Sequence, residues 1–181
     1  MILALYGIAG IILLVVVLIF LAPKSYQVSR SIEILAAKNT VFDFVRYLKK
    51  QNEWSPWFKK DAHMNIRITG VDGQVGAINY WSGNKEVGEG EQEIMRIIDG
   101  ELVEMELRFY RPLKSISYCS LRVENITETK TKVIWSFKGE TNFPMNIFTF
   151  FVNMDKMVGT DFEEGLGTLK LMIERTCDAK N

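Results

Sequence analysis

Apolar residues follow three different patterns along the chain, and each pattern predicts a different kind of element. Between Ile2 and Ala22 there is no charged side chain. The middle of the chain alternates apolar and polar residues in short runs, which is typical of strands with one buried face. From Asn146 to Glu174 the apolar residues recur at spacings of three and four, which is typical of a helix. The sequence therefore predicts an α+β domain that follows one apolar helix.

The N-terminal apolar stretch is long enough for a membrane span, because a helix of about 20 residues crosses the hydrocarbon core. A cleaved signal peptide fits less well, since no Lys or Arg precedes the stretch and Pro23 follows it. We therefore expect a single-pass membrane protein held through residues 2–22. Lys24 and Arg30 come next, and the positive-inside rule then predicts that the soluble domain is cytoplasmic. This division gives residues 1–24 as anchor and linker, 25–176 as the folded domain and 177–181 as a tail.

The folded domain reads as one strand, two short helical segments, about six more strands and a long helix. The expected strands are residues 26–35, 64–68, 75–82, 87–98, 102–110, 115–124 and 132–139, and the expected helices are residues 40–48, 49–58 and 146–174. Asp99-Gly100 predicts a tight hairpin. Gly76, Gly88 and Gly90 lie within strand-like runs, where glycine marks a bend or a bulge. Together these features favour a strongly curved antiparallel sheet wrapped around the final helix.

Three glycines, Gly159, Gly165 and Gly167, lie inside the long helical pattern, where each costs about 1 kcal/mol relative to alanine. They permit close packing on the sheet or a break near Gly159, or they leave room for a ligand. The sequence leaves these interpretations open.

Charge and composition exclude some classes of function. The chain has 22 Lys and Arg against 22 Asp and Glu, whereas a nucleic-acid-binding domain usually carries a basic excess. Cys119 and Cys177 lack the spacing of a metal or redox site, so we expect free thiols. His63 is the only histidine, and no second ligand or nucleophile lies near it in the sequence.

Glu89, Glu91 and Glu93 alternate and therefore share one face of a strand. Such carboxylates perform acid–base chemistry when burial separates their pKa values, but a solvated outer face of a sheet explains the same spacing. We expect the solvated face. The sequence accordingly predicts no catalytic residue, no metal and no cofactor.

Several segments resemble the polyketide cyclase/dehydrase group of the START-like SRPBCC superfamily. The segments are residues 41–45 (VFDFV), 54–57 (WSPW), 80–90 (YWSGNKEVGEG), 133–136 (VIWS) and 154–163 (MDKMVGTDFE). The similarity extends from Tyr26 to Glu174, and together the segments are a more specific signal than any one alone. The resemblance implies a helix-grip fold with a cavity between the sheet and the C-terminal helix. It also implies binding of lipids, polyketides or other hydrophobic molecules.

Strand alternation and the helical stripe predict the residues that line such a cavity. They are Trp54, Trp57, Trp81, Met105, Leu107, Leu121, Trp135, Phe137, Met157, Phe162 and Leu166. Of Trp54 and Trp57, we expect one to fasten the helical segment to the sheet and the other to lie at the cavity mouth. The predicted function is membrane-anchored binding of a hydrophobic small molecule or lipid. The alternatives are an enzyme that acts in the same cavity, and a protein-interaction domain marked by an exposed apolar patch.

Overall fold

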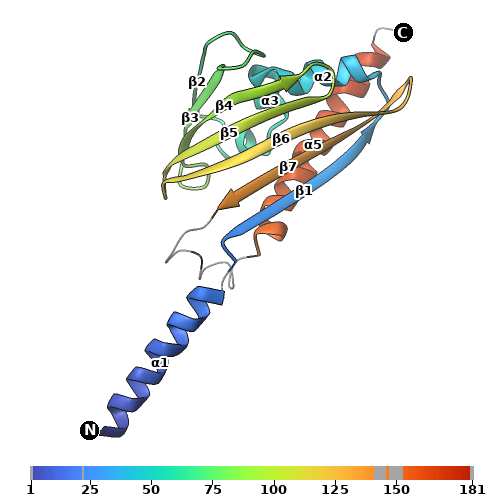
Figure 1. Ribbon diagram of the computed structural model, residues 1–181. Coiled ribbons are helices and arrows are strands. Elements are labelled where there is room, and N and C mark those ends of the chain that lie inside the picture. The colour runs from blue at the N-terminus through green and yellow to red at the C-terminus, as the bar shows by residue number, and fades with distance from the viewer. Residues whose placement is uncertain (1, 22, 141–145, 147–152, 180–181) are drawn as a thin grey trace.

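A seven-stranded antiparallel sheet forms the frame of the molecule (Figure 1). The computed structural model describes residues 2–21, 23–140, 146 and 153–179, with side chains from residue 6 onward. The strands are β1 (Ser25–Ile34), β2 (Asn65–Thr69), β3 (Ile78–Ser82), β4 (Glu89–Ile98), β5 (Leu102–Arg111), β6 (Ser115–Thr127) and β7 (Lys130–Glu140). Their order in the sheet is β1-β7-β6-β5-β4-β3-β2, so the first strand pairs with the last. The expected curved antiparallel sheet is confirmed.

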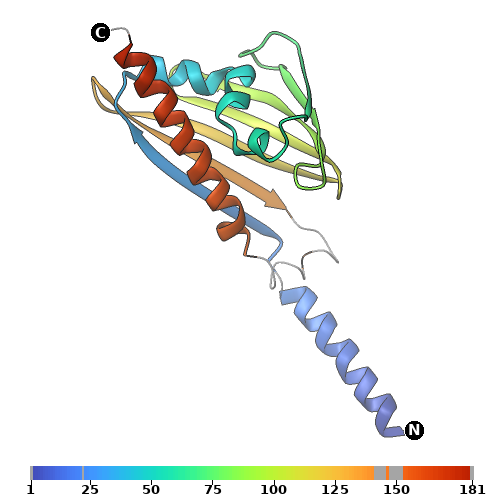
Figure 2. The same cartoon turned by 180° about the vertical axis from the view of Figure 1, so that it is seen from behind.

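Four helices cover the concave face of this sheet (Figure 2). They are α2 (Lys38–Arg46), α3 (Leu48–Trp54), α4 (Pro56–Lys60) and α5 (Met154–Asp178). The side chain of Asn153 caps α5 by accepting a hydrogen bond of 2.9 Å from the Lys156 backbone N–H. The helix continues through Gly159 without a break. Its expected start at Asn146 adjoins residues 147–152, which lie outside the described residues.

Glycine turns set the limits of β4. β4 begins at Glu89 because Gly88 has a φ of +71°, a left-handed conformation that residues with a side chain rarely adopt. The hairpin at Asp99-Gly100 is confirmed, since Gly100 has a φ of +70° in the turn between β4 and β5. The register of β4 against β5 shifts between Glu89 and Gly90, as expected for a bulge. These turns place the loop before β4 at one end of the concave face.

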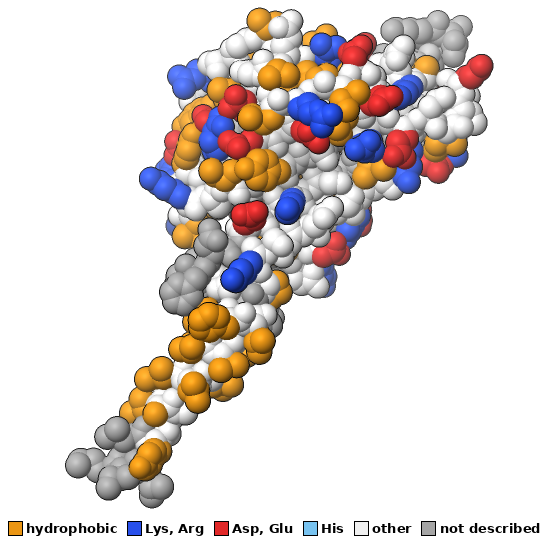
Figure 3. All heavy atoms as spheres, in the orientation of Figure 1, with side chains coloured by type: hydrophobic (Ala, Val, Ile, Leu, Met, Phe, Trp, Pro, Cys, Tyr) orange, Lys and Arg blue, Asp and Glu red, His pale blue; other side chains and the backbone are white. Residues whose placement is uncertain are grey.

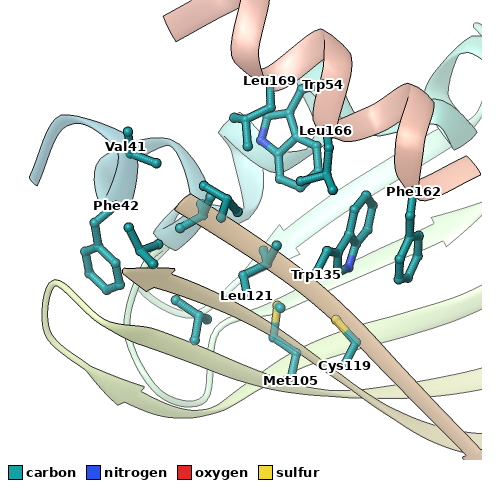
Figure 4. Packing of buried hydrophobic residues seen from close by; sticks show 14 of the residues in the cluster. Val41, Phe42, Trp54, Met105, Cys119, Leu121, Trp135, Phe162, Leu166 and Leu169 are labelled. Atoms are coloured by element: carbon teal, nitrogen blue, oxygen red, sulfur yellow. The ribbon is translucent and has the colours of Figure 1, made fainter. Parts of the chain in front are cut away.

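The concave face is divided into a solid half and a hollow half. In the solid half the C-terminal part of α5 packs through Leu166, Leu169 and Ile173 onto the sheet and α2, where Val41 and Phe42 are buried. Figure 4 shows this packing, with Trp54 beneath α5 next to Leu166 and Leu169. The hollow half lies beneath the N-terminal part of α5, where larger aromatic side chains surround an open space.

The N-terminal helix α1 (Ile2–Leu21) projects away from the sheet (Figure 1), and most of its described apolar side chains are exposed (Figure 3). Nevertheless, within the described part of the chain no helix is both long and apolar enough to cross a membrane. This finding contradicts the predicted span over residues 2–22, and with it the predicted single-pass membrane localisation and cytoplasmic domain.

Arg30 also has a different role from the one that the charge pattern predicts. It lies on the concave face of β1, where its guanidinium forms ion pairs with Asp155 at 2.9 Å and Glu163 at 2.7 Å. Arg30 thus joins the first strand to α5, and its position after the apolar stretch is explained by packing within the domain.

Candidate functional site

A cavity of about 430 Å³ occupies the hollow half of the concave face. Its volume is within the range of small-molecule sites, which is about 300–1,000 Å³. Its walls come from the concave face of the sheet, from α3 and α4, from the loop before β4 and from the N-terminal part of α5. A second hollow of about 420 Å³ lies on the outer face of the sheet, among polar side chains such as Gln27, Ser120 and Lys138.

Aromatic rings form much of the cavity wall. Trp135 on β7 stacks on Phe162 of α5 with ring centroids 4.0 Å apart and planes 3° from parallel (Figure 4). Trp54 and Trp57 approach Trp135 edge-on, at 5.0 Å and 5.7 Å. Edge-to-face and stacked rings are favourable arrangements that hold one another in place. The cavity therefore has rigid, flat walls.

A second aromatic pair lines the cavity from β3 and β5. Trp81 and Phe109 meet edge-to-face with ring centroids 5.7 Å apart. Trp81 fits against the sheet because the neighbouring residue on β4 is Gly90, where a Cβ atom would lie 2.6 Å from the indole ring. The glycine that marks the bulge therefore also makes space for a cavity-lining ring.

Uncharged polar groups gather at the deep end of the cavity. Gln51 and Asn52 of α3 face Asn79 of β3 and Gln92 of β4, and all four residues line the cavity. Gln92 Nε2 donates to Gln51 Oε1 at 2.9 Å, and Asn79 Nδ2 donates to Asn52 Oδ1 at 2.9 Å. Gln51 and Asn79 are buried. We refer to these four residues as the carboxamide cluster.

Tyr26, Ser117 and Cys119 add further neutral polar atoms to the lining. Burial raises the pKa of the Cys119 thiol from 9.0 to about 12, although a hydrogen bond with Trp135 opposes this shift. Burial also raises the pKa of the Tyr26 phenol, opposed by a hydrogen bond with Ser117. Both groups therefore carry their protons at neutral pH, and Cys119 does not have the lowered pKa of a nucleophilic cysteine.

The mouth of the cavity carries its charged residues. Lys60 of α4 donates to both carboxylate oxygens of Asp161 on α5 at 2.7 Å. Glu86 and Arg111 are exposed at the same opening. Lys60 and Asp161 thus neutralise each other's charge and join α4 to α5 at the mouth. The deep end, in contrast, is lined by neutral side chains.

Eight of the predicted site residues line the cavity. They are Trp54, Trp57, Trp81, Leu107, Trp135, Phe137, Met157 and Phe162. Trp54 is buried and donates from Nε1 to the Phe44 carbonyl at 3.3 Å, whereas Trp57 is only half-buried. Met105, Leu121 and Leu166 are not part of this lining; each is about 1% exposed and belongs to the solid half of the core. They share a face or helix with cavity residues but lie nearer the packed end.

The candidate acid–base residues lie outside the cavity. Arg108 forms ion pairs with Glu91 and Glu93 at 2.6 Å and with Glu106 at 2.7 Å on the outer face of the sheet. Glu89 also lies on that face and accepts a hydrogen bond of 2.6 Å from the Tyr80 hydroxyl. His63 is exposed in a turn. The carboxylate ladder is thus on the outer face, as expected, but it is paired with cations and a phenol instead of being freely solvated.

The glycines of α5 serve packing at two positions. A Cβ at Gly159 would lie 2.2 Å from Nη2 of Arg30, and one at Gly165 would lie 2.9 Å from the Trp135 ring. A Cβ at Gly167 would meet nothing within 4 Å. None of the three glycines is part of the cavity lining. The interpretation that Gly165 leaves room for a ligand is therefore wrong, because the indole of Trp135 already fills that space.

The sequence pattern did not predict the carboxamide cluster. Gln92 occupies an inward position between Gly90 and Ile94 on β4, so an amide at that position was a detectable exception to the apolar alternation. Gln51 and Asn52 carried no such signal, because they lie in a strongly polar helix, LKKQNEW, whose packing against the sheet depends on the tertiary fold.

Comparison with known proteins identifies the architecture. No protein-family model and no curated protein matches the sequence. Among solved structures, norcoclaurine synthase from Thalictrum flavum superposes with a TM-score of 0.65 at 10% identity, over 87% of this chain and 97% of that one. A protein from Nitrosospira multiformis has a TM-score of 0.59 at 18% identity, over 82% of this chain and 96% of that one. The chain has a helix-grip fold.

A third similar structure is the Aha1 dimer from Colwellia psychrerythraea, with a TM-score of 0.57 at 15% identity, over 82% of this chain and 96% of that one. At these identities the similarity establishes the fold and not the activity. The helix-grip fold that the resemblance implies is thus confirmed. The assignment to the polyketide cyclase/dehydrase group stays a prediction.

Proposed function

We propose that the protein binds a hydrophobic small molecule in the cavity beneath the N-terminal part of α5. The observation that carries this proposal is a cavity of about 430 Å³ with rigid aromatic walls and a few polar groups at one end. Small-molecule sites generally combine an apolar lining with a small number of fixed polar atoms. Norcoclaurine synthase, which shares the fold, was solved in complex with dopamine and hydroxybenzaldehyde, two small aromatic molecules.

Binding is tested by calorimetric titration of the full chain with naphthalene, an apolar probe with flat faces. Leu107→Phe adds bulk to the cavity wall, whereas Leu171→Phe makes the same change on an exposed position of α5. Overpacking costs about 1–3 kcal/mol. If the bound ligand bears that cost, Leu107→Phe weakens naphthalene binding by about fivefold to 150-fold, and Leu171→Phe does not. An absence of binding to the wild-type chain would refute the proposal.

The exposed apolar surface of α1 favours a second candidate function, which is contact with a protein partner, and the partner tested here is a second copy of the chain. Ile11 and Leu13 are 63% and 66% exposed, and Phe20 is 78% exposed. A contiguous apolar surface of this kind usually contacts another apolar surface. Light scattering of the full chain and of a variant with Ile11 and Leu13 changed to Gln tests this function. A mass that does not change with concentration or with the substitutions would argue against association of the chain through α1.

An enzyme acting in the same cavity stays a prediction. Two titratable side chains of the lining, Tyr26 and Cys119, are both held neutral, and the carboxamides do not titrate. The carboxylates among the described lining residues, Glu86 and Asp161, lie at the mouth, and Asp161 is paired there with Lys60.

A further inference from the structure

The carboxamide cluster brings together side chains that are far apart in the sequence. Gln51 and Asn52 lie on α3, and they meet Asn79 of β3 and Gln92 of β4 across the end of the cavity. The Gln51 amide is fixed from behind, because its Nε2 donates to the Val45 carbonyl at 2.7 Å. The cluster is therefore an ordered set of hydrogen-bonding groups in an otherwise aromatic and aliphatic wall.

Contacts within the protein do not use the full hydrogen-bonding capacity of the cluster. A carboxamide has two N–H donors and a carbonyl oxygen that accepts up to two hydrogen bonds. Gln92 Nε2 donates to Gln51 Oε1 and contacts the sulfur of Met105, but no hydrogen bond from a described residue reaches Gln92 Oε1. Asn79 Nδ2 donates one hydrogen bond to Asn52, which leaves its second N–H available. A carbonyl acceptor and an amide donor thus remain for a ligand.

The position of charge in the cavity restricts the ligand further. Its charged lining residues, Lys60, Glu86, Arg111 and Asp161, lie at the mouth. A carboxylate or ammonium group at the deep end would lose its hydration without gaining an opposite charge, which is costly. A hydroxyl or carbonyl group, in contrast, exchanges its hydrogen bonds with water for hydrogen bonds with the amides.

We propose that the carboxamide cluster is the subsite for the polar group of an uncharged aromatic ligand, such as a phenol or an aryl ketone. The rings of this ligand lie between the aromatic side chains, and its hydroxyl or carbonyl group points to Gln92 and Asn79. This assignment rests on the proposed binding function, and it adds the chemical class of the ligand. A phenolic hydroxyl matches both remaining groups, because it donates to Gln92 Oε1 and accepts from Asn79 Nδ2.

Three probes with the same ring system test the assignment: naphthalene, 2-naphthol and 2-naphthoate, titrated calorimetrically into the full chain near neutral pH. We expect 2-naphthol to bind about fivefold to tenfold more tightly than naphthalene, the effect of about one neutral hydrogen bond. We expect 2-naphthoate to bind more weakly than naphthalene. Gln92→Met should reduce the advantage of 2-naphthol to less than about twofold and leave naphthalene binding nearly unchanged.

Gln74→Met is the matched control, because Gln74 is exposed between β2 and β3 and lines neither hollow. This variant should keep the wild-type order of the three probes. If Gln92→Met does not melt cooperatively, the relative affinities of the three probes for the wild-type chain decide the assignment. Naphthalene binding as tight as that of 2-naphthol, or tightest binding of 2-naphthoate, would overturn the assignment and leave the proposed function intact. No binding of any probe would overturn both.

Discussion

Alanine substitutions at Gly165 and Gly167 of α5 test how tightly this helix packs against Trp135 in the cavity wall. Both residues lie in the same helix, two positions apart, so an alanine at either one gains the same helix propensity, about 1 kcal/mol. They differ in their surroundings. A Cβ at Gly165 would lie 2.9 Å from Cζ3 of Trp135 and 3.0 Å from Cδ of Pro56, whereas a Cβ at Gly167 would meet nothing within 4 Å.

Trp135 has little freedom to move away from an added methyl group. Its ring is stacked on Phe162 at 4.0 Å and contacted edge-on by Trp54 at 5.0 Å. Overpacking of this kind costs about 1–3 kcal/mol. Since the propensity gain cancels between the two variants, their stabilities should differ by this steric cost. For a domain of this size the difference corresponds to a melting temperature about 2–12 °C lower for Gly165→Ala than for Gly167→Ala.

Thermal and urea denaturation of wild type, Gly165→Ala and Gly167→Ala provides the assay. We expect Gly167→Ala to melt at or above the wild-type temperature and Gly165→Ala to melt below Gly167→Ala. Trp135 also lines the cavity, so a shift of its ring should weaken naphthalene binding in Gly165→Ala but not in Gly167→Ala. If the two variants melt together, the contact between α5 and the Trp135 ring is loose, and the account of rigid aromatic walls is incorrect.

Three further predictions concern other parts of the domain. Gly159→Ala should lower the melting temperature, because its Cβ would displace the guanidinium of Arg30 from Asp155 and Glu163; the same melt as for Gly167→Ala would contradict this reasoning. Burial raises the pKa of the Cys119 thiol from 9.0 to about 12, so the thiol of the unfolded chain loses its proton first as pH rises. The contribution of Cys119 to the free energy of unfolding is therefore complete below pH 9.0 and is lost as the pH rises toward about 12. Cys119→Ala should therefore flatten the loss of urea stability at alkaline pH, and an unchanged slope would exclude this contribution. Removal of residues 1–24 should leave a cooperative melt, since α1 projects away from the sheet; an aggregated fragment would show that α1 belongs to the folded core.

The alternation of residues was sufficient to predict the sheet and the side of it that is buried. Val133, Trp135 and Phe137 lie on the concave face because side chains of a strand point alternately to its two faces. The hairpin at Asp99-Gly100 and the long C-terminal helix were likewise predictable, since turn residues and helical spacing are local signals. The order of these elements, together with the resemblance, was enough to predict the helix-grip fold.

Local signals do not determine which half of a buried face is solid and which is hollow. Met105 and Leu107 are neighbours on the same face of β5, yet Met105 lies in the core, where Gln51 of α3 contacts its sulfur, and Leu107 lines the cavity. Gly165 and Gly167 both interrupt the helical pattern, and the positions of Trp135 and Pro56 distinguish their surroundings.

Local sequence signals likewise did not predict the carboxamide cluster at the candidate site. Gln51 lies in a helix of mostly polar residues, and it becomes buried because α3 packs against the sheet, where Gln51 meets Gln92 of β4. Hydrophobic periodicity determined the layers of this protein, because burial of apolar surface acts on every residue of a strand or helix. The tertiary structure determined the cavity and its polar end, because these depend on where two elements distant in the sequence meet.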